Sequence, residues 1–374
     1  MQILPELVCA PTVYAVGDDY QIMVPVKSPL LFWVEIGGRR YYDHSNGIIR
    51  SDVTMHRVTV RMSVLDKAGS YKVGYRKIIE RKPYFSEVEE PVEMEFPFRP
   101  VPYDRPLRLY HLSDTHGNFD MTSACAKYFG DSPSDLDLLI LNGDIPDHSG
   151  KVENFSLIFR LCAEITHGEI PVIFSRGNHD TRGVCAEKLE DYTPTDHGRS
   201  YYTFRLGPIW GMVLDCAEDK DDSHEAYGHC NCCHEFRLEE TDFIREVVAR
   251  EEWKAPGVKY RLLIAHNPFT YILHAPFDIE REIYDEWAAL LENTVRPQAL
   301  ICGHLHTIEI SQKGGRLDNS AHGQICPVII AATPGEKWAE FYASAITLDG
   351  LTMKVVFNDS HHRVVGGDTF EIVE

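Results

Sequence analysis

The chain has 374 residues, of which 44% are hydrophobic and 25% are charged, so it is too long and too apolar to be a disordered tail or a disulfide-stabilised miniprotein. Lys and Arg total 37 against 57 Asp and Glu, and the formal charge of −20 opposes long-range attraction to nucleic acid or to an anionic membrane surface. The charge therefore argues against a nonspecific nucleic-acid-binding protein and against a membrane partner.

Short strands are predicted throughout the first hundred residues. The segments are rich in Val, Ile, Phe, Tyr and Trp and are separated by glycine-containing turns; they cover 21–26, 30–36, 56–65, 70–79 and 91–98. This pattern predicts a small all-β sandwich of the immunoglobulin or fibronectin kind. The proline-rich segment 99–106 then forms a stiff connection. We therefore predict an N-terminal β-sandwich domain at 1–104 and a second domain at 105–374.

Beyond residue 105, apolar runs alternate with segments of helical length. The runs are nearly continuous, as expected for strands buried on both faces, and cover 107–113, 137–142, 171–176, 260–265 and 299–302. Segments 152–167, 238–251 and 281–292 combine spaced apolar residues with charges, which indicates helices. The alternation predicts an α/β layered sandwich, with sheets flanked by helices and a hairpin over 341–357 closing the sheet.

Metal-ligating residues follow each of the five predicted buried strands. The strand ends carry Asp114-Thr115-His116, Asn142-Gly143-Asp144, Gly177-Asn178-His179-Asp180, His266-Asn267 and Gly303-His304-Leu305-His306. Because the carboxyl ends of strands converge on the ligand crevice in α/β folds, these groups should meet in space. Two Asp, one Asn and four His provide nitrogen and oxygen donors for two divalent first-row ions, and Mn, Fe, Zn or Co suits this mixture better than Ca.

The order of these motifs resembles that of the calcineurin-like metallophosphoesterase superfamily over roughly residues 106–357. The resemblance implies a hydrolase of phosphoric ester bonds that holds two divalent ions, with Mn, Fe and Zn as the candidates. It implies that one ion is held by Asp114, His116, Asp144 and His306, and that the other is held by Asp144, Asn178, His266 and His304.

A β-sandwich before such a domain also resembles the layout of purple acid phosphatases. The chain departs from their motifs at two positions, since His116 stands where they have glycine and Asp147 stands where they have the tyrosine that colours the ferric ion. We therefore expect an ordinary divalent pair rather than an Fe(III) centre.

Two bound ions would lower the pKa of a bridging water, and the predicted reaction is in-line attack of the resulting hydroxide on phosphorus. By the resemblance, His179 protonates the leaving alkoxide, and Asp180 orients the His179 ring. Arg182 is expected to bind a nonbridging phosphate oxygen, with Arg176 as the weaker candidate for this role.

A cysteine- and histidine-rich loop spans Cys216 to His234. Five potential ligands between His229 and His234 suggest either a structural zinc site or a lid that selects the substrate. The Cys-x-Cys-Cys-His spacing differs from the paired cysteines of zinc ribbons. The acidic run 218–222 is interpreted as a solvated loop.

The expected substrate is a small phosphorylated molecule, and the motifs do not separate phosphate monoesters from diesters. The domain order slightly favours a phosphomonoesterase. The alternatives are a phosphodiesterase acting on cyclic nucleotides or glycerophosphodiesters, and a non-catalytic binding module on the same fold. An enclosed, arginine-rich pocket would favour the monoester, and an open groove with apolar walls would favour the diester.

Residues 1–20 lack a basic segment followed by an apolar one, and no run of about 18 uninterrupted apolar residues occurs in the chain. We therefore expect a soluble, cytoplasmic protein. Its ten cysteines lack the dense spacing of a secreted disulfide framework, so most should be reduced thiols. The sequence leaves the oligomeric state open.

Overall fold

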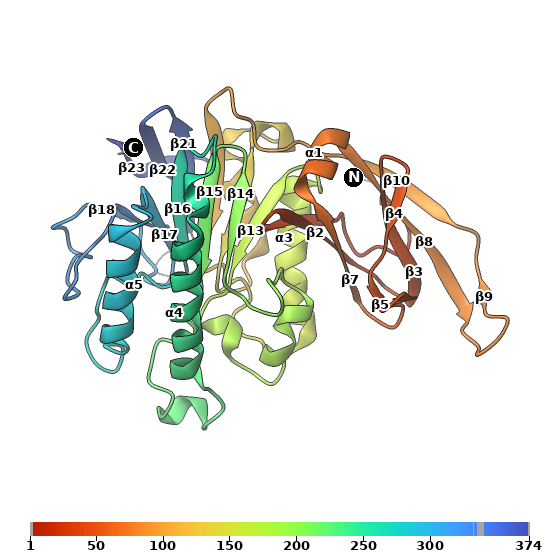
Figure 1. Cartoon of the computed structure of the whole chain (residues 1–374), viewed down its shortest axis with the longest axis horizontal. Helices are drawn as coiled ribbons and strands as arrows, with labels where there is room; N and C mark the ends of the chain where they lie inside the picture. Colours follow the sequence, from red (N-terminus) through yellow and green to blue (C-terminus); the bar gives the residue numbers. More distant parts are fainter. Residues whose placement is uncertain (1–2, 332, 335–339, 373–374) are drawn as a thin grey trace.

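The computed structural model describes residues 3–331, 333–334 and 340–372. Two large β-sheets form its centre, helices lie on their outer sides, and the N-terminal strands extend from one end (Figure 1). No helix within the described ranges is long and apolar enough to cross a membrane. All ten cysteines are free thiols, and six of them are buried, in agreement with the prediction from their spacing.

The first sheet combines strands from both ends of the chain. Its order is β23 (Val364–Glu371), β22 (Thr352–Asp359), β21 (Phe341–Asp349), β11 (Leu107–Leu112), β12 (Leu138–Asn142), β13 (Pro171–Ser175), β1 (Thr12–Val16), β2 (Asp19–Pro25) and β7 (Met55–Arg61), with β20 (Thr333–Pro334) paired to β21. The strands β11, β12 and β13 are parallel to one another. The predicted C-terminal hairpin is present as β21 and β22.

The second sheet has the order β14 (Tyr202–Leu206), β15 (Ile209–Leu214), β16 (Tyr260–Ala265), β17 (Ala299–Cys302), β19 (Val328–Ile330) and β18 (Glu309–Ser311). Its centre, from β15 to β19, is parallel. The outer strands β14 and β18 are antiparallel to their neighbours.

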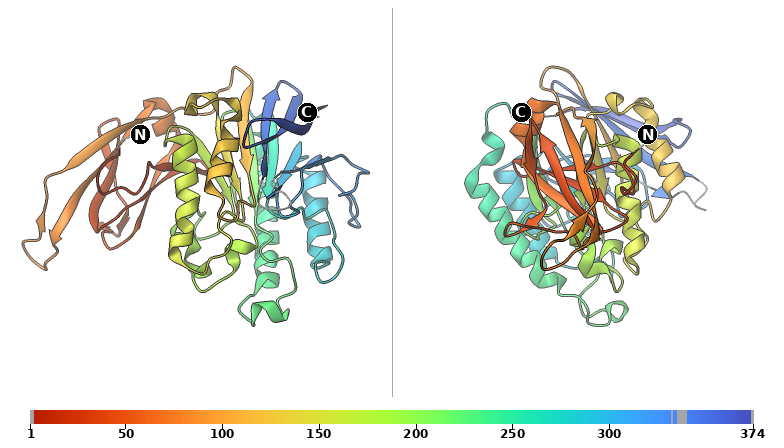
Figure 2. Two further views of the ribbon diagram at one scale, coloured as in Figure 1. Left: turned by 180° about the vertical axis from the view of Figure 1, so that it is seen from behind. Right: turned by 90° about the vertical axis from the view of Figure 1, so that its right-hand side faces the viewer.

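The central strands of each sheet are buried on both faces because they lie between the other sheet and a layer of helices (Figure 2). In β12, Leu138 and Ile140 belong to the core between the sheets, whereas Leu139 and Leu141 belong to the core beneath α3 (Ser156–Thr166). On the opposite side, α4 (Cys233–Arg250) and α5 (Arg281–Asn293) pack on the second sheet. This burial explains the nearly continuous apolar runs and confirms the predicted α/β layered sandwich.

Short helical segments connect these layers. They are α2 (Phe119–Cys125) and the 3₁₀ helices η1 (Ala126–Phe129), η2 (Pro133–Asp135), η3 (Val152–Phe155), η4 (His179–Thr181), η5 (Ala186–Asp191), η6 (Glu225–Tyr227) and η7 (Glu252–Lys254).

The N-terminal region is rich in β-structure, as predicted, but its strands are divided between two sheets. One sheet has the order β10 (Val92–Pro97), β8 (Ser70–Glu80), β3 (Leu30–Ile36) and β4 (Arg39–Tyr41), with β9 (Glu87–Val88) paired to β8. The strands β1, β2 and β7 instead extend the first large sheet, where Val13 of β1 lies opposite Pro171 of β13. Backbone pairing therefore crosses the predicted boundary at residue 104, and the division into two domains stays a prediction.

The strand predicted over 56–65 is shorter in the structure. It ends at Arg61, and the helix α1 (Met62–Ala68) follows directly. Met62 and Leu65 are buried and lie three residues apart, a spacing that places them on one face of a helix. Gly69 ends the helix with a left-handed backbone, φ 67°. A short hairpin, β5 (His44–Ser45) and β6 (Ile48–Ile49), lies in the same region.

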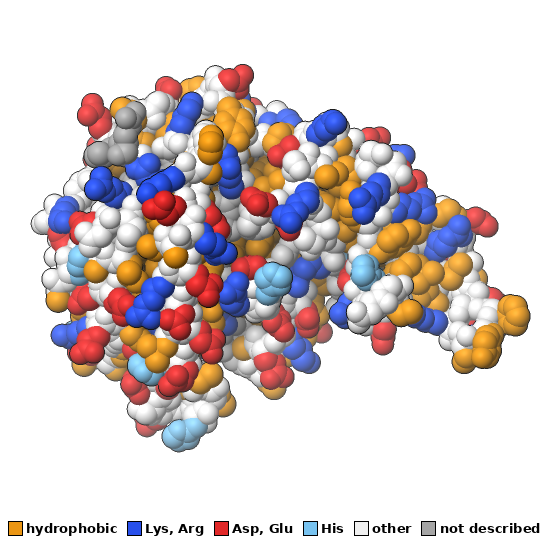
Figure 3. All heavy atoms as spheres, in the orientation of Figure 1, with side chains coloured by type: hydrophobic (Ala, Val, Ile, Leu, Met, Phe, Trp, Pro, Cys, Tyr) orange, Lys and Arg blue, Asp and Glu red, His pale blue; other side chains and the backbone are white. Residues whose placement is uncertain are grey.

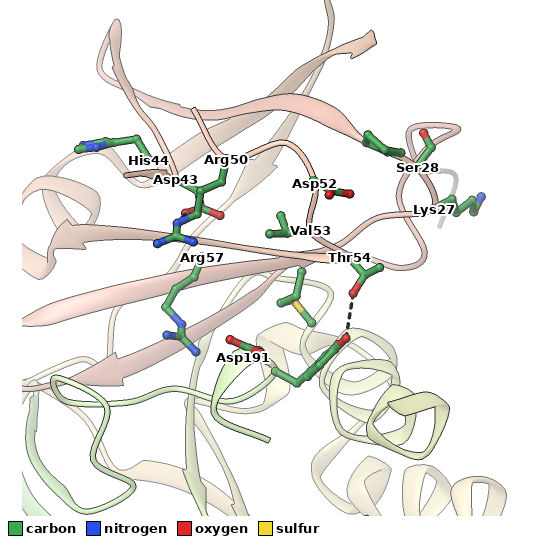
Figure 4. A pocket seen from close by; sticks show the side chains of 13 residues that line it. Lys27, Ser28, Asp43, His44, Arg50, Asp52, Val53, Thr54, Arg57 and Asp191 are labelled. Atoms are coloured by element: carbon green, nitrogen blue, oxygen red, sulfur yellow. Dashed lines mark hydrogen bonds and ion pairs between the residues drawn. The ribbon is translucent and has the colours of Figure 1, made fainter. Parts of the chain in front are cut away.

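A cavity of about 760 Å³ lies where the N-terminal strands meet the segment around η5 (Figure 4). Contacts across it include a hydrogen bond of 2.9 Å between the hydroxyls of Thr54 and Tyr192, and a bond of 2.6 Å from Arg57 Nη2 to the Thr193 carbonyl oxygen. None of the seven predicted metal ligands lines this cavity.

The hairpin between β8 and β9 projects from the end of the molecule. Tyr84 and Phe85 at its tip are 80% and 94% exposed, and hydrophobic side chains are visible at this end in Figure 3.

Candidate metal centre

The predicted metal ligands extend from strands of both large sheets. Asp114 and His116 follow β11, Asp144 follows β12, and Asn178 follows β13, all in the first sheet. The remaining three come from the second sheet, with His266 after β16 and both His304 and His306 after β17. The site is therefore formed where the carboxyl ends of two facing sheets meet.

Short distances connect the ligands that follow β11, β12, β16 and β17. His266 Nε2 lies 3.1 Å from Asp144 Oδ2 and 3.8 Å from Asp114 Oδ1. His306 Nε2 lies 3.3 Å from Asp114 Oδ1 and 3.1 Å from His116 Nε2. His116 Nε2 is also 4.0 Å from Asp144 Oδ2. Three groups of three potential ligands therefore lie close enough to hold an ion. Two of these groups contain Asp114, and the third consists of His116, Asp144 and His179.

Asn178 and His304 form the other side of the centre. The Asn178 side-chain oxygen lies 3.0 Å from His304 Nδ1 and faces only acceptor groups in this orientation. A cation bound by both the Asn178 oxygen and the His304 nitrogen would explain why two acceptor atoms face each other. With the amide turned over, its nitrogen donates to His304, and its oxygen accepts from Arg182 Nη2 at 2.8 Å. All seven predicted ligands are thus brought to one crevice.

The backbone at most of these positions is strained. Five of the seven residues have a left-handed conformation, with φ values of 49° at Asp114, 41° at His116, 54° at Asp144, 66° at His304 and 48° at His306. Non-glycine residues rarely adopt this conformation, and such strain persists only where the surrounding structure enforces it. Its concentration in the crevice indicates a functional site.

The charges of the crevice also fit a bound cation. Asp114 and Asp144 are almost completely buried, at 0% and 1% exposed. Although burial opposes the charge, His266 holds the pKa of Asp144 below its usual range, and the two carboxylates raise the pKa of His266 to about 10. Burial and the charge of His266 lower the pKa of His304 to about 4. The two buried carboxylates require positive charge, which the proton on His266 supplies here. Divalent ions of the Mn, Fe and Zn group would supply it instead once His266 binds them as a neutral ring.

The His179 ring is held between two groups of known polarity. Its Nδ1 lies 2.8 Å from the Asp147 carbonyl oxygen, and its Nε2 lies 3.0 Å from Arg182 Nη1. Because a carbonyl oxygen only accepts and a guanidinium only donates, the ring carries its proton on Nδ1. The role of His179 as an acid stays a prediction, since it requires a proton on Nε2 and displacement of Arg182.

Asp180 does not occupy the position that the sequence predicts. Its Oδ2 accepts hydrogen bonds from the backbone N–H groups of Asp144, at 3.0 Å, and Gly177, at 2.8 Å, and its Oδ1 is buried without a partner among the described residues. The prediction that Asp180 orients His179 needs correction, because the Asp147 carbonyl oxygen holds that ring. Burial and the charge of Asp144 raise the pKa of Asp180 to about 7.

Arg182 reaches the crevice, but Glu218 already pairs with it. Arg182 Nε and Nη2 donate to Glu218 Oε1 and Oε2 at 2.8 Å each. Arg176 Nε instead lies 2.7 Å from Asp215 Oδ2, and its guanidinium stacks over the Phe236 ring on the side of α4. Of the two predicted arginines, only Arg182 lies beside a predicted ligand.

Two acidic partners of the site were not predicted. Glu218 is 0% exposed, so interpreting the run 218–222 as a solvated loop is wrong at this position. Asp147 Oδ1 lies 3.2 Å from His116 Nδ1 and so orients a predicted metal ligand. The only sequence signal was the location of Asp147 three residues after Asp144.

An apolar pocket lies directly beside the metal ligands. Its volume is about 40 Å³, and its lining includes His304 and Asp219. Most of its wall is apolar or aromatic, from Phe269, Tyr271, Leu273, Phe277, Ile279, Tyr284 and Leu305. The pocket is small, but its side chains offer an apolar wall against which a substituent of a group bound at the centre can lie.

The cysteine- and histidine-rich loop does not form a zinc site in the structure. Within the described ranges, the groups of three or more potential ligands that converge all lie in the crevice. In the loop, His234 Nδ1 instead lies 3.0 Å from Glu280 Oε2, and His224 Nδ1 accepts from the Ala226 N–H at 3.2 Å. The zinc alternative therefore lacks support.

One family model matches more than half of the chain. The model of the family described as calcineurin-like phosphoesterase matches residues 107–307. A curated protein of Fibrobacter succinogenes, named as a probable cyclic nucleotide phosphodiesterase, is 24% identical over 227 residues, which cover 59% of this chain and 77% of that protein.

Two solved structures share the fold over nearly the whole chain. The purple acid phosphatase PPD1 from yellow lupin seeds has a TM-score of 0.62 at 12% identity, covering 96% of this chain and 74% of its own. A structure described as PhoD has a TM-score of 0.58 at 10% identity, covering 99% of this chain and 90% of its own. The similarity to both therefore includes the N-terminal β-rich region.

Proposed function

The chain belongs to the calcineurin-like phosphoesterase family and is a hydrolase of phosphoester bonds, and within this class we propose that its substrates are small phosphate diesters. The observation that carries the proposal is the apolar pocket beside His304. A diester has two esterified substituents on phosphorus, so one can lie against the apolar wall of this pocket while the other leaves.

The charge around the crevice supports the same choice. Arg182 lies beside the predicted ligands, but the buried carboxylate of Glu218 already neutralises it. A dianionic monoester gains most from unpaired positive charge, whereas a singly charged diester needs less. The name of the curated relative from Fibrobacter succinogenes supports a diester as well.

We assign two divalent ions to the crevice, with Mn, Fe and Zn as candidates. One would be held by Asp114, His116, Asp144 and His306, and the other by Asp144, Asn178, His266 and His304. Such ions supply Lewis-acid stabilisation of the charge on the phosphoryl group.

The protein groups have separate tasks in this proposal. Asp147 keeps the His116 ring in position through its carboxylate and the His179 ring through its backbone carbonyl. When a substrate oxygen displaces Arg182 from His179 Nε2, that nitrogen can take up a proton from solvent and then donate it to the leaving oxygen. Arg182 Nη1 can then donate to a phosphoryl oxygen.

Hydrolysis of phosphate monoesters is the second candidate. It is favoured by the order of a β-rich N-terminal region followed by a phosphoesterase region. It differs from the first candidate in that the apolar pocket would bind no second ester group.

The test compares bis-p-nitrophenyl phosphate with p-nitrophenyl phosphate. Protein stripped of metal is reloaded with Mn, Zn or Fe, and kcat/KM is measured for both compounds, with His179→Ala as a variant of the crevice. We expect metal-dependent turnover with a preference for the diester of roughly tenfold or more. Preference for the monoester would support the second candidate, and absence of turnover with two ions bound per chain would overturn both.

A further inference from the structure

The segment from Cys216 to Cys232, which precedes α4, is held firmly at its α4 end. The Asp222 carboxylate accepts the N–H groups of Cys233 and His234 in the first turn of α4, at 2.9 Å each. Arg237 of α4 is 1% exposed, and it donates to the backbone carbonyl oxygens of Cys216 and Glu218. The position of Glu218 is therefore set by a helix outside the crevice.

The side chain of Glu218 points from this segment to Arg182. It is fully buried, and its two oxygens accept the Nε and Nη2 hydrogens of Arg182 in a two-point contact of 2.8 Å each. The Thr181 and Tyr227 hydroxyls also lie 2.9 Å from its oxygens. Thr181 shares its hydrogen with the Asn178 carbonyl oxygen, and Tyr227 shares its hydrogen with Asp219 Oδ1. A buried carboxylate with this many donors has one well-defined orientation.

The contact with Glu218 leaves one end of Arg182 directed at the crevice. A guanidinium has five N–H donors, and the Nε and Nη2 donors face Glu218 and Asp219. Nη2 also lies 2.8 Å from the Asn178 amide oxygen when that amide is turned over. Nη1 faces His179 Nε2 at 3.0 Å, and the Arg182 side chain is 30% exposed. Nη1 is thus the nitrogen that a ligand in the crevice can reach.

We propose that Glu218 is a positioning residue, which holds Arg182 so that its Nη1 binds a phosphoryl oxygen beside His179. The inference rests on the proposed function because it takes the substrate phosphoryl group to be the ligand of the crevice. It also gives the segment before α4 a role that its sequence did not reveal, as the structure that fixes an arginine in the crevice.

Glu218→Gln is the sharpest test. The glutamine has nearly the same shape, but its amide can accept at only one end, so the two-point contact with Arg182 is lost. The first measurement is the Kd of inorganic phosphate for the Mn-loaded protein by calorimetry. We expect the Kd to rise roughly tenfold, and KM for the hydrolysed ester to rise in parallel.

Asp137→Asn is the matched control. Asp137 is 3% exposed and forms a similar two-point contact with Arg105, at 2.9 Å and 2.5 Å, in a different part of the molecule. Both substitutions remove one charge from a buried carboxylate that binds an arginine. We expect Asp137→Asn to lower the thermal midpoint while leaving the Kd of phosphate unchanged.

A double-mutant cycle separates positioning from a general structural effect. In the Arg182→Lys background the two-point contact is already absent, so adding Glu218→Gln should change the Kd of phosphate less than twofold. If Glu218→Gln does not fold, Tyr227→Phe removes one hydrogen bond from Glu218 and should raise the Kd roughly threefold.

An unchanged Kd in folded Glu218→Gln, or equal effects in both backgrounds, would overturn the proposal. A lower Kd would overturn it too, because it would mean that Glu218 only neutralises the charge of Arg182. Phosphate binding that depends on Glu218 in a protein without esterase activity would support the positioning role while the proposed function fails. Diester or monoester turnover together with phosphate binding that does not depend on Glu218 would support the esterase function while the positioning role fails.

Discussion

His116 Nε2 and His306 Nε2 face each other at 3.1 Å, although 190 residues separate them in the chain. His116 follows β11 of the first sheet and His306 follows β17 of the second, so this pair spans the junction between the two sheets. At most one hydrogen can lie between two neutral imidazole nitrogens, whereas a cation can bind both.

The variant His306→Ala should therefore bind one divalent ion instead of two. We expect two divalent ions per wild-type chain and one per variant chain after equilibration with Mn and desalting, measured by elemental analysis. Because histidine must be neutral to ligate, lowering the pH from 7 to 5 should weaken binding in the wild type. Two ions in the variant would contradict the assignment, and His44→Ala, at an exposed histidine outside the crevice, serves as the control.

Gly143 precedes Asp144 and has a left-handed backbone, φ 78°. A Cβ at this position would meet His266 Nδ1 at 2.5 Å and the Gly177 Cα at 2.6 Å. Gly143→Ala should therefore push apart strand ends of both sheets, with a cost of about 1–3 kcal/mol.

We expect metal affinity of Gly143→Ala to fall together with stability, as measured by calorimetry and urea unfolding. Gly350→Ala is the control, because Gly350 also has positive φ, 57°, but its Cβ would have open space around it. A Gly143→Ala protein with wild-type metal affinity would show that the tight packing at this position does not shape the site.

The apolar pocket predicts a change in substrate preference. Phe277→Ala and Tyr271→Ala remove aromatic side chains beside His304, and contact of an aromatic ester group with them contributes roughly 1–2 kcal/mol. KM for bis-p-nitrophenyl phosphate should rise roughly fivefold to thirtyfold, with little change for p-nitrophenyl phosphate. Equal changes for both compounds would argue that the pocket does not bind the second ester group. Tyr84→Ala, at the distant hairpin tip, should change neither value.

The strands and the ligand set could be predicted because each depends on local chemistry. The run at 260–265 is apolar throughout since both faces of β16 are buried, and it matches the strand in full. The left-handed turns after β11, β12 and β17 place Asp or His directly behind such runs, so the motifs are visible without the fold.

The partners of the site could not be predicted, because they depend on contacts between distant segments. Glu218 lies in an acidic run, and no local pattern reveals that Arg182, 36 residues earlier, pairs with it. Asp180 illustrates the opposite error, since adjacency to His179 in sequence suggested a contact, whereas its carboxylate binds backbone N–H groups of Asp144 and Gly177. The pairing of β1 with β13 was missed for the same reason.

A buried acid in α4 should make stability depend on pH. Glu240 is 0% exposed; its Oε1 accepts the Asp215 N–H at 2.8 Å, and its Oε2 has no partner among the described residues. Burial and the charge of Asp215 raise the pKa of Glu240 well above its ordinary value, although Arg176 and Arg237 oppose this. The folded chain therefore holds a proton at pH values where the unfolded chain has lost it.

Since the folded state binds the additional proton, the stability contribution of Glu240 is present below its ordinary pKa and is lost as pH rises towards the folded pKa. Glu240→Gln keeps an oxygen for the Asp215 N–H but removes the titration. We expect the variant to gain about 1 kcal/mol or more over the wild type between pH 5 and pH 8, measured by urea unfolding at each pH. The exposed neighbour Glu239 provides the matched control Glu239→Gln, which removes the same charge from α4 without contacting Asp215. A constant difference between Glu240→Gln and wild type across this range would mean that Glu240 is already ionised in the folded protein at pH 5.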